Sequence, residues 1–407
     1  RFGCFTLANK RGLGKDGLMR LALQRCARPH FWATRACCAC VRHQSTRQVT
    51  VGSPDDIASF AAMEPHPRSV EYLTSTLEPR QIAEFLQLEM PIRYAERIRA
   101  LEKVPTWKNV PDLVDVHKIH VESFKDFRSS SVEDFAEVTH KALLREQPVV
   151  EKLAKSVHQL SDDVGVGIAD DYVSKFLDDF LLNRIGCQVL LGHYLACRAG
   201  QRNGIIDTRC DTKRVCRAAA KDVTAMCVEC TGYKPFVFVD AYSACGEKGL
   251  DDGHVPRFPY MPHVLKYVVS EILKNSCRAT ADLLKIRTHD VSDYPINVII
   301  CADEDHVTVC VSDQAGGIPR GANPWSYLYT TAKDGYGGSK KLAGHGVGLP
   351  LSRLYARYLG GSLDLVSLPG YGTHAYINLP RVQSQQVEVV PDADYEYDYA
   401  NLLDFTV

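Results

Sequence analysis

Hydrophobic positions recur at helical spacing through the first half of the chain. Between about residues 79 and 230, apolar side chains return every three or four positions in a series of long segments, which is typical of amphipathic helices. Short links join these segments, and that combination predicts an antiparallel helical bundle. Pro91 falls inside the first long segment, so we expect the helix to break or kink there.

The pattern changes after residue 232. "PFVFVDA" predicts a strand, residues 262–284 predict a helix, and "INVIICADEDHVTVCVSDQ" predicts two strands around a tight turn at Asp303–Asp305. "LPLSRLYARYLGG" predicts a helix that ends at two glycines, and "SLDLVSLPGYGTHAYINLP" predicts a hairpin that turns at Gly370 and Gly372. Strands mixed with helices after a helical half indicate an α+β protein.

Composition narrows the class of protein without identifying it. The 407 residues suffice for about two domains, and 45% hydrophobic with 24% charged residues is ordinary for a globular protein. The formal net charge of -1 gives no overall attraction for nucleic acid or anionic membrane. No apolar run reaches the roughly 18 residues that span a bilayer. We therefore expect neither nucleic-acid binding nor membrane insertion.

The cysteines do not form a recognisable framework. The one C-x-x-C pair outside the first 50 residues, Cys227 and Cys230, has no second pair at zinc-site spacing. Most of the others stand singly within helix or strand patterns, where a free thiol behaves as a small apolar side chain. We expect these residues to pack in the core, without disulfides.

Residues 1–50 differ in kind from the rest. They are rich in arginine, and Asp16 is their one acidic residue; from Met19 onwards no acidic residue occurs before Asp55. An arginine-rich, acid-free segment that can form an amphipathic helix is typical of a mitochondrial transit peptide, and a disordered basic arm is the alternative. The expected domains are a leader at 1–50, a helical regulatory and docking bundle at 51–232, a sheet domain at 233–381 and an acidic, aromatic tail at 382–407.

One predicted helix carries polar chemistry beside its apolar stripe. Glu271, Asn275 and Arg278 are spaced i, i+4 and i+7, so they share one helix face, with Lys274 beside them. Charges on a partly buried helix are costly without partners, so this face predicts a ligand. The turn "GHGVGLP", residues 344–350, stands directly before another helix. Its glycines and the helix N-terminus make a seat for phosphate, although the spacing is that of neither a P-loop nor a Rossmann turn.

The order of these segments resembles that of the ATPase domain shared by DNA gyrase, the large ATP-driven heat-shock chaperones, mismatch-repair ATPases and histidine kinases. That order is an acid-and-amide helix, a strand ending in "DQAGGI", the glycine-rich turn with its helix, and G-x-G-T at Gly370 to Thr373. Within this class, "LQLEMPIRYAERI", "YVSKFLDDFLLNRIG", "EILKNSCRAT" and "GLPLSRLYARYLGGSLDLVSLPGYGT" are similar to the mitochondrial kinases of pyruvate dehydrogenase and branched-chain 2-oxoacid dehydrogenase. The resemblance implies an antiparallel four-helix bundle followed by a Bergerat-type (GHKL) α/β sandwich that binds ATP.

The resemblance also implies roles for matching residues. Glu271 would be the general base for a substrate serine, Asn275 would hold Mg²⁺, and Asp313 would accept a hydrogen bond from the adenine amino group. Further residues implied to contact the nucleotide are Arg278, Thr330, Thr331, Gly344, His345, Gly346, Val347, Gly348, Leu349 and Thr373.

The implied function is that of an ATP- and Mg²⁺-dependent serine kinase of the mitochondrial matrix. It would phosphorylate and inactivate the decarboxylase α subunit of a pyruvate or branched-chain 2-oxoacid dehydrogenase complex. The implied partners are that subunit, the lipoyl domain of the acyltransferase core and a second copy in a homodimer. Two alternatives stay open: a histidine-kinase-like enzyme, although no clear H-E-x-R-T-P helix occurs, and a nucleotide-binding scaffold that transfers no phosphate.

Three positions depart from the family pattern. Ala315 replaces the first of the two glycines that usually follow the aspartate, and if that site needs a positive φ the alanine costs roughly 1–2 kcal/mol. A bundle histidine of many members falls on Glu146, and nearby His140 is expected to be a surface residue of its helix. Tyr267 stands where branched-chain members have tyrosine and pyruvate-type members have histidine.

Overall fold

The computed structural model describes residues 51–75, 77–164, 169–243, 255–286, 291–327, 346–383 and 386–391. Statements about the structure concern these residues. The expected transit peptide at 1–50 lies outside them, as do the last residues, 392–407. So do four residues that the sequence predicts to contact nucleotide, namely Thr330, Thr331, Gly344 and His345.

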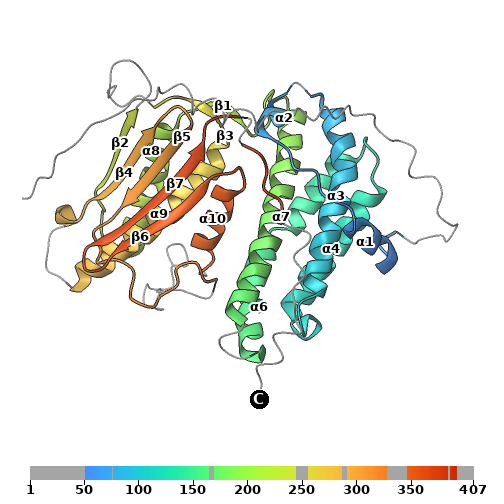
Figure 1. Cartoon of the computed structure of the whole chain (residues 1–407), viewed down its shortest axis with the longest axis horizontal. Helices are drawn as coiled ribbons and strands as arrows, with labels where there is room; N and C mark the ends of the chain where they lie inside the picture. Colours follow the sequence, from blue (N-terminus) through green and yellow to red (C-terminus); the bar gives the residue numbers. More distant parts are fainter. Residues whose placement is uncertain are drawn as a thin grey trace, which may run out of the picture. The chain divides into compact units, whose positions relative to one another are not determined.

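Four long helices of the first half surround a shared core. They are α3 (Pro79–Glu102), α4 (Pro111–Ser129), α6 (Val149–Val164) and α7 (Ala169–Arg198). The helix α3 contacts α4 and α7, and α6 also contacts α4 and α7, which closes a ring (Figure 1). This arrangement is consistent with the expected four-helix bundle. The shorter elements here are α1 (Pro54–Ala61), α2 (Val70–Thr74), η1 (Trp107–Asn109) and α5 (Phe135–Arg145).

The helix α3 continues through Pro91, so the expected break does not occur, while a kink within the continuous helix stays a prediction. Pro79 occupies its first turn and Gln81 completes a capping box with Glu78, so the start of the helix follows local rules. Proline inside a helix costs about 3 kcal/mol. Met90 and Tyr94, on either side of Pro91, are both fully buried, and this packing outweighs the local cost.

The second half builds a five-stranded sheet in the order β2-β4-β5-β7-β6. Its strands are β2 (Val237–Ser243), β4 (Ile296–Ala302), β5 (His306–Ser312), β6 (Ser362–Leu368) and β7 (Gly372–Pro380). The pair β2–β4 is parallel and the other pairs are antiparallel. Both predicted turns are confirmed: the Asp303 carboxylate accepts from the amides of Asp305 and His306, and Gly370 turns the β6–β7 hairpin with φ 82°.

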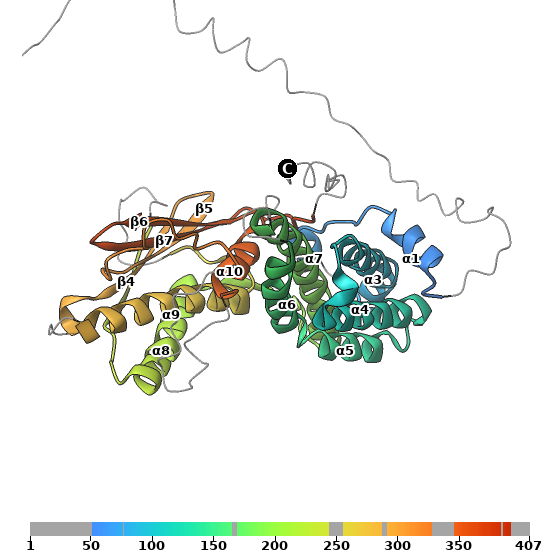
Figure 2. The same ribbon diagram turned by 90° about the horizontal axis from the view of Figure 1, so that it is seen from below.

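Helices cover one face of this sheet. They are α8 (Thr212–Thr231), α9 (Pro262–Ile286) and α10 (Gly348–Arg357), and Figure 2 shows α8 and α9 on the same side of the strands. Inward side chains such as Val298, Ile300 and Val309 are buried against them. The helical spacing of α8 predicts that it belongs to the bundle, but α8 packs on α9, β2 and β4. The small elements of this half are β1 (Asp207–Cys210), which pairs with β3 (Phe258–Tyr260), and η2 (Val291–Asp293).

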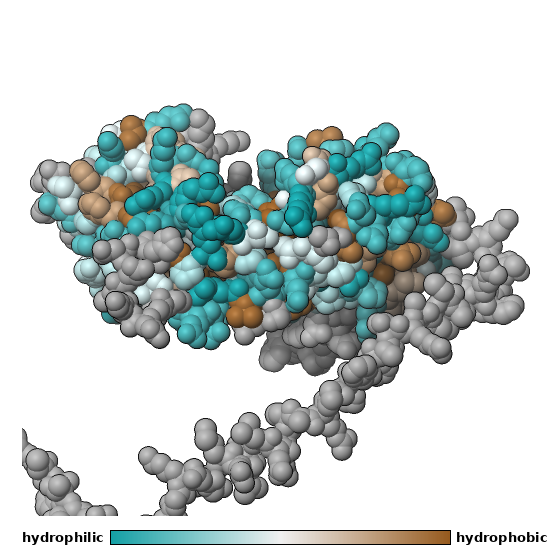
Figure 3. Space-filling view, turned by 90° about the horizontal axis from the view of Figure 1, so that it is seen from above, coloured by the Kyte–Doolittle hydropathy of each residue, from teal (hydrophilic) through white to brown (hydrophobic). Residues whose placement is uncertain are grey.

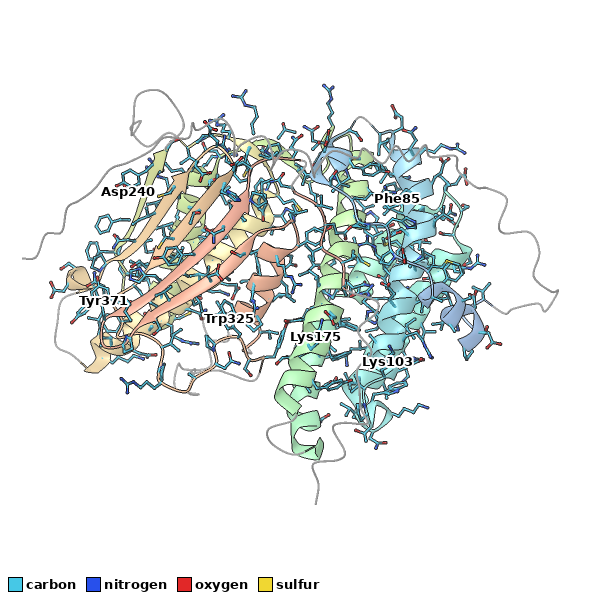
Figure 4. The ribbon with its side chains drawn as sticks, viewed as in Figure 1. Phe85, Lys103, Lys175, Asp240, Trp325 and Tyr371 are labelled. Atoms are coloured by element: carbon cyan, nitrogen blue, oxygen red, sulfur yellow. The ribbon has the colours of Figure 1, made fainter. Side chains whose placement is uncertain are left out.

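The other face of the sheet is bare of described elements. Large apolar side chains stand exposed on it, on edge strands as well as central ones. Figure 4 labels Asp240 on the edge strand β2 and Tyr371 at the β6–β7 turn. The exposed apolar residues are Phe238, Tyr242, Ile299, Val366, Leu368 and Tyr371.

Chain beyond β7 packs back onto the protein. Residues 386–391 lie within the predicted acidic tail, yet Gln386 and Glu388 are buried, and Val387 forms a β-bridge with Ser69 at the start of α2. The first part of the predicted tail therefore belongs to the folded unit. On the face drawn in Figure 3, hydrophobic residues form separate patches within a largely hydrophilic surface. Among the described helices, none is long and apolar enough to cross a membrane.

Candidate functional site

A cavity opens where α9, the end of β5 and the start of α10 meet. Glu271, Asn275 and Arg278 of α9 line one side of it. Asp313, after β5, and Thr373, in β7, line it as well, together with Gly346, Gly348 and Leu349. Of the described residues predicted to contact nucleotide, Val347 alone is not a lining residue; it caps α10.

The helix α9 presents its polar face to this cavity because its apolar face packs in the hydrophobic core. Leu265, Val269 and Leu273 are almost completely buried, as the apolar stripe predicts. Glu271, Lys274 and Asn275 occupy the remaining face. The residues were identified from helical spacing alone, and the structure brings them to one cavity.

Glu271 and Lys274 form an ion pair one turn apart on α9. Their side chains are only 16% and 20% exposed, so each charge needs the partner that the other provides. The second carboxylate oxygen of Glu271 lies against Gly348, and a side chain at 348 would collide with it. Gly348 is therefore required for this close approach and not for an unusual φ.

Asp313 is buried and its carboxylate is fixed by three donors. The Ser276 hydroxyl donates to Oδ2 over 2.8 Å, and the amides of Ala315 and Thr373 donate to Oδ1 over 3.1 and 3.3 Å. The carboxylate is thus oriented before any ligand binds. Sequence reasoning missed Ser276, because it lies one position off the i, i+4 face; its position beside Asn275 was the available signal.

Ala315 carries no backbone strain. Among described residues other than glycine, a positive φ occurs at Thr106, and the turn after Asp313 places its positive φ values on Gly316 and Gly317. The cost considered for an alanine at 315 therefore does not arise. The substitution leaves the binding turn intact.

Tyr267 lies one turn before Glu271 and packs edge-on against Tyr355 of α10, with ring centroids 5.1 Å apart. Burial, with a smaller contribution from Glu271, raises the pKa of Tyr267, so this phenol stays neutral. The tyrosine pair and the Glu271–Gly348 contact both join α9 to α10 beside the cavity.

A second polar cluster lies inside the bundle, around Glu146. Its carboxylate accepts from Arg97 Nη1 over 2.9 Å and Arg184 Nε over 3.0 Å, and His120 Nε2 lies 3.3 Å away. Burial alone would raise the pKa of Glu146, but the charge of Arg97, with those of His120 and Arg184, holds it well below the usual value. His140, on α5, is exposed, as expected.

The donors in the cavity suit magnesium. Within the described part of the chain, no group of three or more His, Cys, Asp or Glu residues could hold a metal on its own. Mg²⁺ is commonly bound by one or two protein oxygens, with substrate phosphates and water completing its shell. The amide of Asn275, which lines the same cavity as the start of α10, fits that use.

Cys227 is buried on α8, and Cys230 lies on the same helix.

Comparisons with known proteins agree with this geometry. The family described as "Histidine kinase-, DNA gyrase B-, and HSP90-like ATPase" matches residues 262–383, which contain the whole described cavity. The fold and the site therefore define an ATPase domain of this class. The family described as "Mitochondrial branched-chain alpha-ketoacid dehydrogenase kinase" matches residues 66–219.

Individual relatives point the same way. The chain is 33% identical over 327 residues to the mitochondrial [pyruvate dehydrogenase (acetyl-transferring)] kinase of Arabidopsis thaliana, covering 75% of this chain and 86% of the relative. It is 31% identical to the Drosophila melanogaster kinase of that name, over 75% and 79% of the two chains. It is 28% identical to isozyme 4 of Homo sapiens, over 83% and 87%. The chain belongs to the family of mitochondrial pyruvate dehydrogenase and branched-chain α-ketoacid dehydrogenase kinases.

Proposed function

We propose that this protein is an ATP- and Mg²⁺-dependent protein serine kinase of the mitochondrial matrix. It phosphorylates, and so inactivates, the decarboxylase α subunit of a 2-oxoacid dehydrogenase complex. The observation that carries the proposal is one cavity lined by Glu271, Asn275 and Asp313 in a chain whose relatives are named pyruvate dehydrogenase kinases. Those names favour the pyruvate complex as substrate, while Tyr267 and the bundle's family match keep the branched-chain complex in view.

The nucleotide is recognised at its two ends. Asp313 accepts a hydrogen bond from the adenine amino group, and an ionised carboxylate, which has no proton to donate, suits that donor. Ser276 and two backbone amides hold its oxygens in place for this contact. At the other end, Gly346 and Gly348 let the backbone approach the phosphates, and the start of α10 adds aligned N–H groups.

Phosphoryl transfer requires positioning and charge neutralisation above all. Asn275 would hold Mg²⁺, and the bound ion would neutralise charge on the phosphate oxygens. Glu271 takes the proton of the substrate serine hydroxyl; the serine oxygen then bonds to the γ-phosphorus while the bond to the ADP oxygen breaks. The proton ends on the Glu271 carboxylate and the phosphate on serine.

Lys274 links nucleotide binding to the base. Without nucleotide its ammonium group pairs with Glu271, which occupies the carboxylate that must accept the proton. The triphosphate offers the same ammonium group a stronger anionic partner. Movement of Lys274 towards phosphate therefore leaves Glu271 ready to act.

The bare face of the sheet supports the homodimer. Phe238 and Tyr371 are each 50% exposed, and Ile299 lies between the edges. Large exposed apolar side chains gathered on one face of a sheet are typical of an interface. A second copy that packs its own bare face here buries both patches symmetrically. An aspartate at Ile299 would place charge in this interface, and light scattering would then report a monomer.

The bundle is the proposed docking region, and its partner is the lipoyl domain of the acyltransferase core, as the family resemblance implies. The matrix location rests on relatives named mitochondrial and on the arginine-rich, acid-poor leader. Residues 19–50 fused to a reporter should direct it to mitochondria. A reporter left in the cytosol would contradict the transit peptide.

Radiolabelled ATP with purified pyruvate and branched-chain dehydrogenase complexes, tested side by side, is the experiment that decides. Label on serine of one decarboxylase α subunit, with loss of that complex's activity, is the expected result. Acid-labile label on the kinase itself would favour a histidine-kinase-like enzyme. Tight nucleotide binding without label on either complex would favour a scaffold.

A further inference from the structure

Residues 386–389, here called the strap, run between the sheet region and the bundle. The carbonyl of Gln386 accepts from the Val70 amide over 2.9 Å, and the Glu388 amide donates to the Arg68 carbonyl over 2.9 Å. The Gln386 side chain donates to the carbonyl of Pro380, at the end of β7, over 2.7 Å. Backbone and side-chain bonds thus attach the strap to both regions.

Glu388 is the charged centre of the strap and is only 4% exposed. Both of its oxygens accept from the guanidinium of Arg93 on α3, and Arg93 Nη2 lies 2.9 Å from Oε2. Gly186 on α7 borders the same pair, and a side chain there would collide with it. A buried carboxylate persists only with such partners, so the strap is held on the bundle by geometry as well as charge.

The strap also holds the end of α10. The Val389 amide donates to the carbonyl of Tyr358, the residue that caps α10, over 2.9 Å. The ring of Tyr358 borders the same Glu388–Arg93 pair, since all three side chains lie around Gly186. Burial, with the charge of Glu388 close by, raises the pKa of the Tyr358 phenol well above its usual value. Two neighbouring residues of the strap therefore join the two regions: the Glu388 carboxylate binds Arg93 of the bundle, and the Val389 amide binds the C-terminal end of α10.

The opposite end of α10 lies in the nucleotide cavity. Gly348, its first residue, borders Glu271, and the Ser352 hydroxyl donates to the Gly348 carbonyl over 2.7 Å. A helix of this length is about 15 Å long and moves as a unit. The position of its far end, at Tyr358, consequently sets the position of its phosphate-facing end.

We propose that the strap is a brace through which the bundle holds α10 against the nucleotide cavity, with Glu388 as a positioning residue. Glu388 touches neither nucleotide nor substrate; it acts through Tyr358 and α10. By linkage, nucleotide bound at the start of α10 must also tighten the strap on the bundle. The activity that it serves rests on the proposed function, whereas its effect on nucleotide binding does not.

The test measures nucleotide binding and amide exchange in the full chain. Wild-type protein titrated with Mg²⁺–ADP should show slower hydrogen exchange at the amides of Val70, Glu388 and Val389 than nucleotide-free protein. Glu388→Gln leaves Arg93 paired with Glu89, 2.7 Å away, so the variant should fold. Couplings between sites are typically 5- to 150-fold; we expect ADP to bind Glu388→Gln about tenfold more weakly, with the nucleotide-dependent protection lost.

A matched control lies on the same bundle helix. Glu84→Gln removes an exposed ion pair with Arg80 on α3, and should change neither affinity nor exchange at the strap. Tyr358→Phe removes the buried hydroxyl of the ring that borders the Glu388–Arg93 pair but leaves the Arg93 pair itself, and should weaken ADP binding in the same direction. If Glu388→Gln fails to fold, the ADP affinity of Tyr358→Phe is the measurement that tests the proposal.

Two results would overturn the brace. One is wild-type ADP affinity in a folded Glu388→Gln or Tyr358→Phe variant. The other is strap amides whose exchange ignores nucleotide in the wild-type chain. Failure of the proposed function has a different signature, namely normal ADP binding and normal strap protection without phosphate transfer to either complex.

Discussion

Two polar clusters of similar residue types differ in their surroundings: one is buried within the bundle, and the other lines an open cavity. In the bundle, Glu146 is buried at 1% exposure, with Arg97 and Arg184 both directed at it. In the sheet region, Glu271 and Lys274 are partly exposed beside a cavity, with Asn275 and Arg278 lining the same space. The bundle carboxylate has its partners within the fold, whereas the polar face of α9 is open to a ligand.

The difference lies in what surrounds each charge. A carboxylate taken out of water needs partners of excellent geometry, and the bundle supplies them from α3 and α7. Beside α9, the turn before α10 carries glycines, which have no side chain. An open space therefore remains next to the polar face of α9, whereas in the bundle arginine side chains fill the corresponding space. Charged residues on a helix therefore indicate function only when the neighbouring elements leave room.

The largest expected effect is at Asn275, the proposed metal ligand. Asn275→Ala should abolish phosphate transfer and Mg²⁺-dependent ATP binding while circular dichroism shows an intact fold, because the side chain is exposed. Calorimetry with and without Mg²⁺ is the measurement. Asn109→Ala, on an exposed turn of the bundle, is the control. Near-wild-type affinity for Mg²⁺–ATP in Asn275→Ala would contradict the assignment.

Glu271 comes next. A positioned general base typically contributes about 10²–10⁴-fold, and Glu271→Gln keeps the shape but cannot take the serine proton. Turnover should fall by that factor with ATP affinity little changed, since Asn275 and the glycine turn remain. Equal losses of affinity and turnover would make Glu271 a structural partner of Lys274. A full-rate Gln variant would remove it from the mechanism and strengthen the scaffold alternative.

Glu146 tests the closed cluster. Removing one partner of a buried ion pair costs about 3–5 kcal/mol, so Glu146→Ala should lower the free energy of unfolding by that amount, measured in urea. Because the pKa of Glu146 is depressed in the folded state, its contribution is present above the unfolded value and is lost as pH falls. An unchanged unfolding midpoint would show that the cluster contributes little net free energy to the stability of the fold.

Glu96 gives the opposite pH dependence in the same bundle. Burial raises its pKa to about 7, although Arg93 and the Asn183 amide lower it. The stability associated with its proton is complete below the unfolded pKa and is lost as pH rises through about 7. Glu96→Gln mimics the protonated form, so it should flatten the dependence of the free energy of unfolding on pH. Above pH 7 the variant should be more stable than the wild type by about 1–3 kcal/mol, at roughly 1.4 kcal/mol per pKa unit. A wild-type slope in the variant would contradict this.

The smallest expected effect is at Ser276. Ser276→Ala removes one of three donors to Asp313, and the amides of Ala315 and Thr373 still hold the carboxylate in place. ATP should bind several-fold more weakly, with turnover at saturation preserved, since the loss concerns adenine recognition. Ser352→Ala is the comparison variant, because it removes a single hydroxyl-to-carbonyl hydrogen bond in α10, at the proposed phosphate end of the cavity. Unchanged ATP affinity would show that the two amides alone orient Asp313.

Much of the fold could be read from local pattern. The stripe that buries α9, the turn at Asp303 and the glycine at 370 each depend on residues a few positions apart, and the structure agrees with all three. The polar face of α9 was visible for the same reason, because helical spacing alone puts Glu271 and Asn275 together. Pro91 misled because a local cost was outweighed by burial on neighbouring helices.

Long-range contacts were beyond such reasoning. Ser276 reaches Asp313 across 37 positions of sequence, and Arg93 reaches Glu388 across 295. No periodicity marks these pairs, since each side chain is ordinary in its own segment and acquires its meaning from the element packed against it. The amino-acid sequence alone therefore predicted which residues could do the chemistry and in which elements they lie. Only the packing of α3, α7, α9 and α10 decided which charges are closed off, which remain open to a ligand, and that the chain after β7 holds the two regions together.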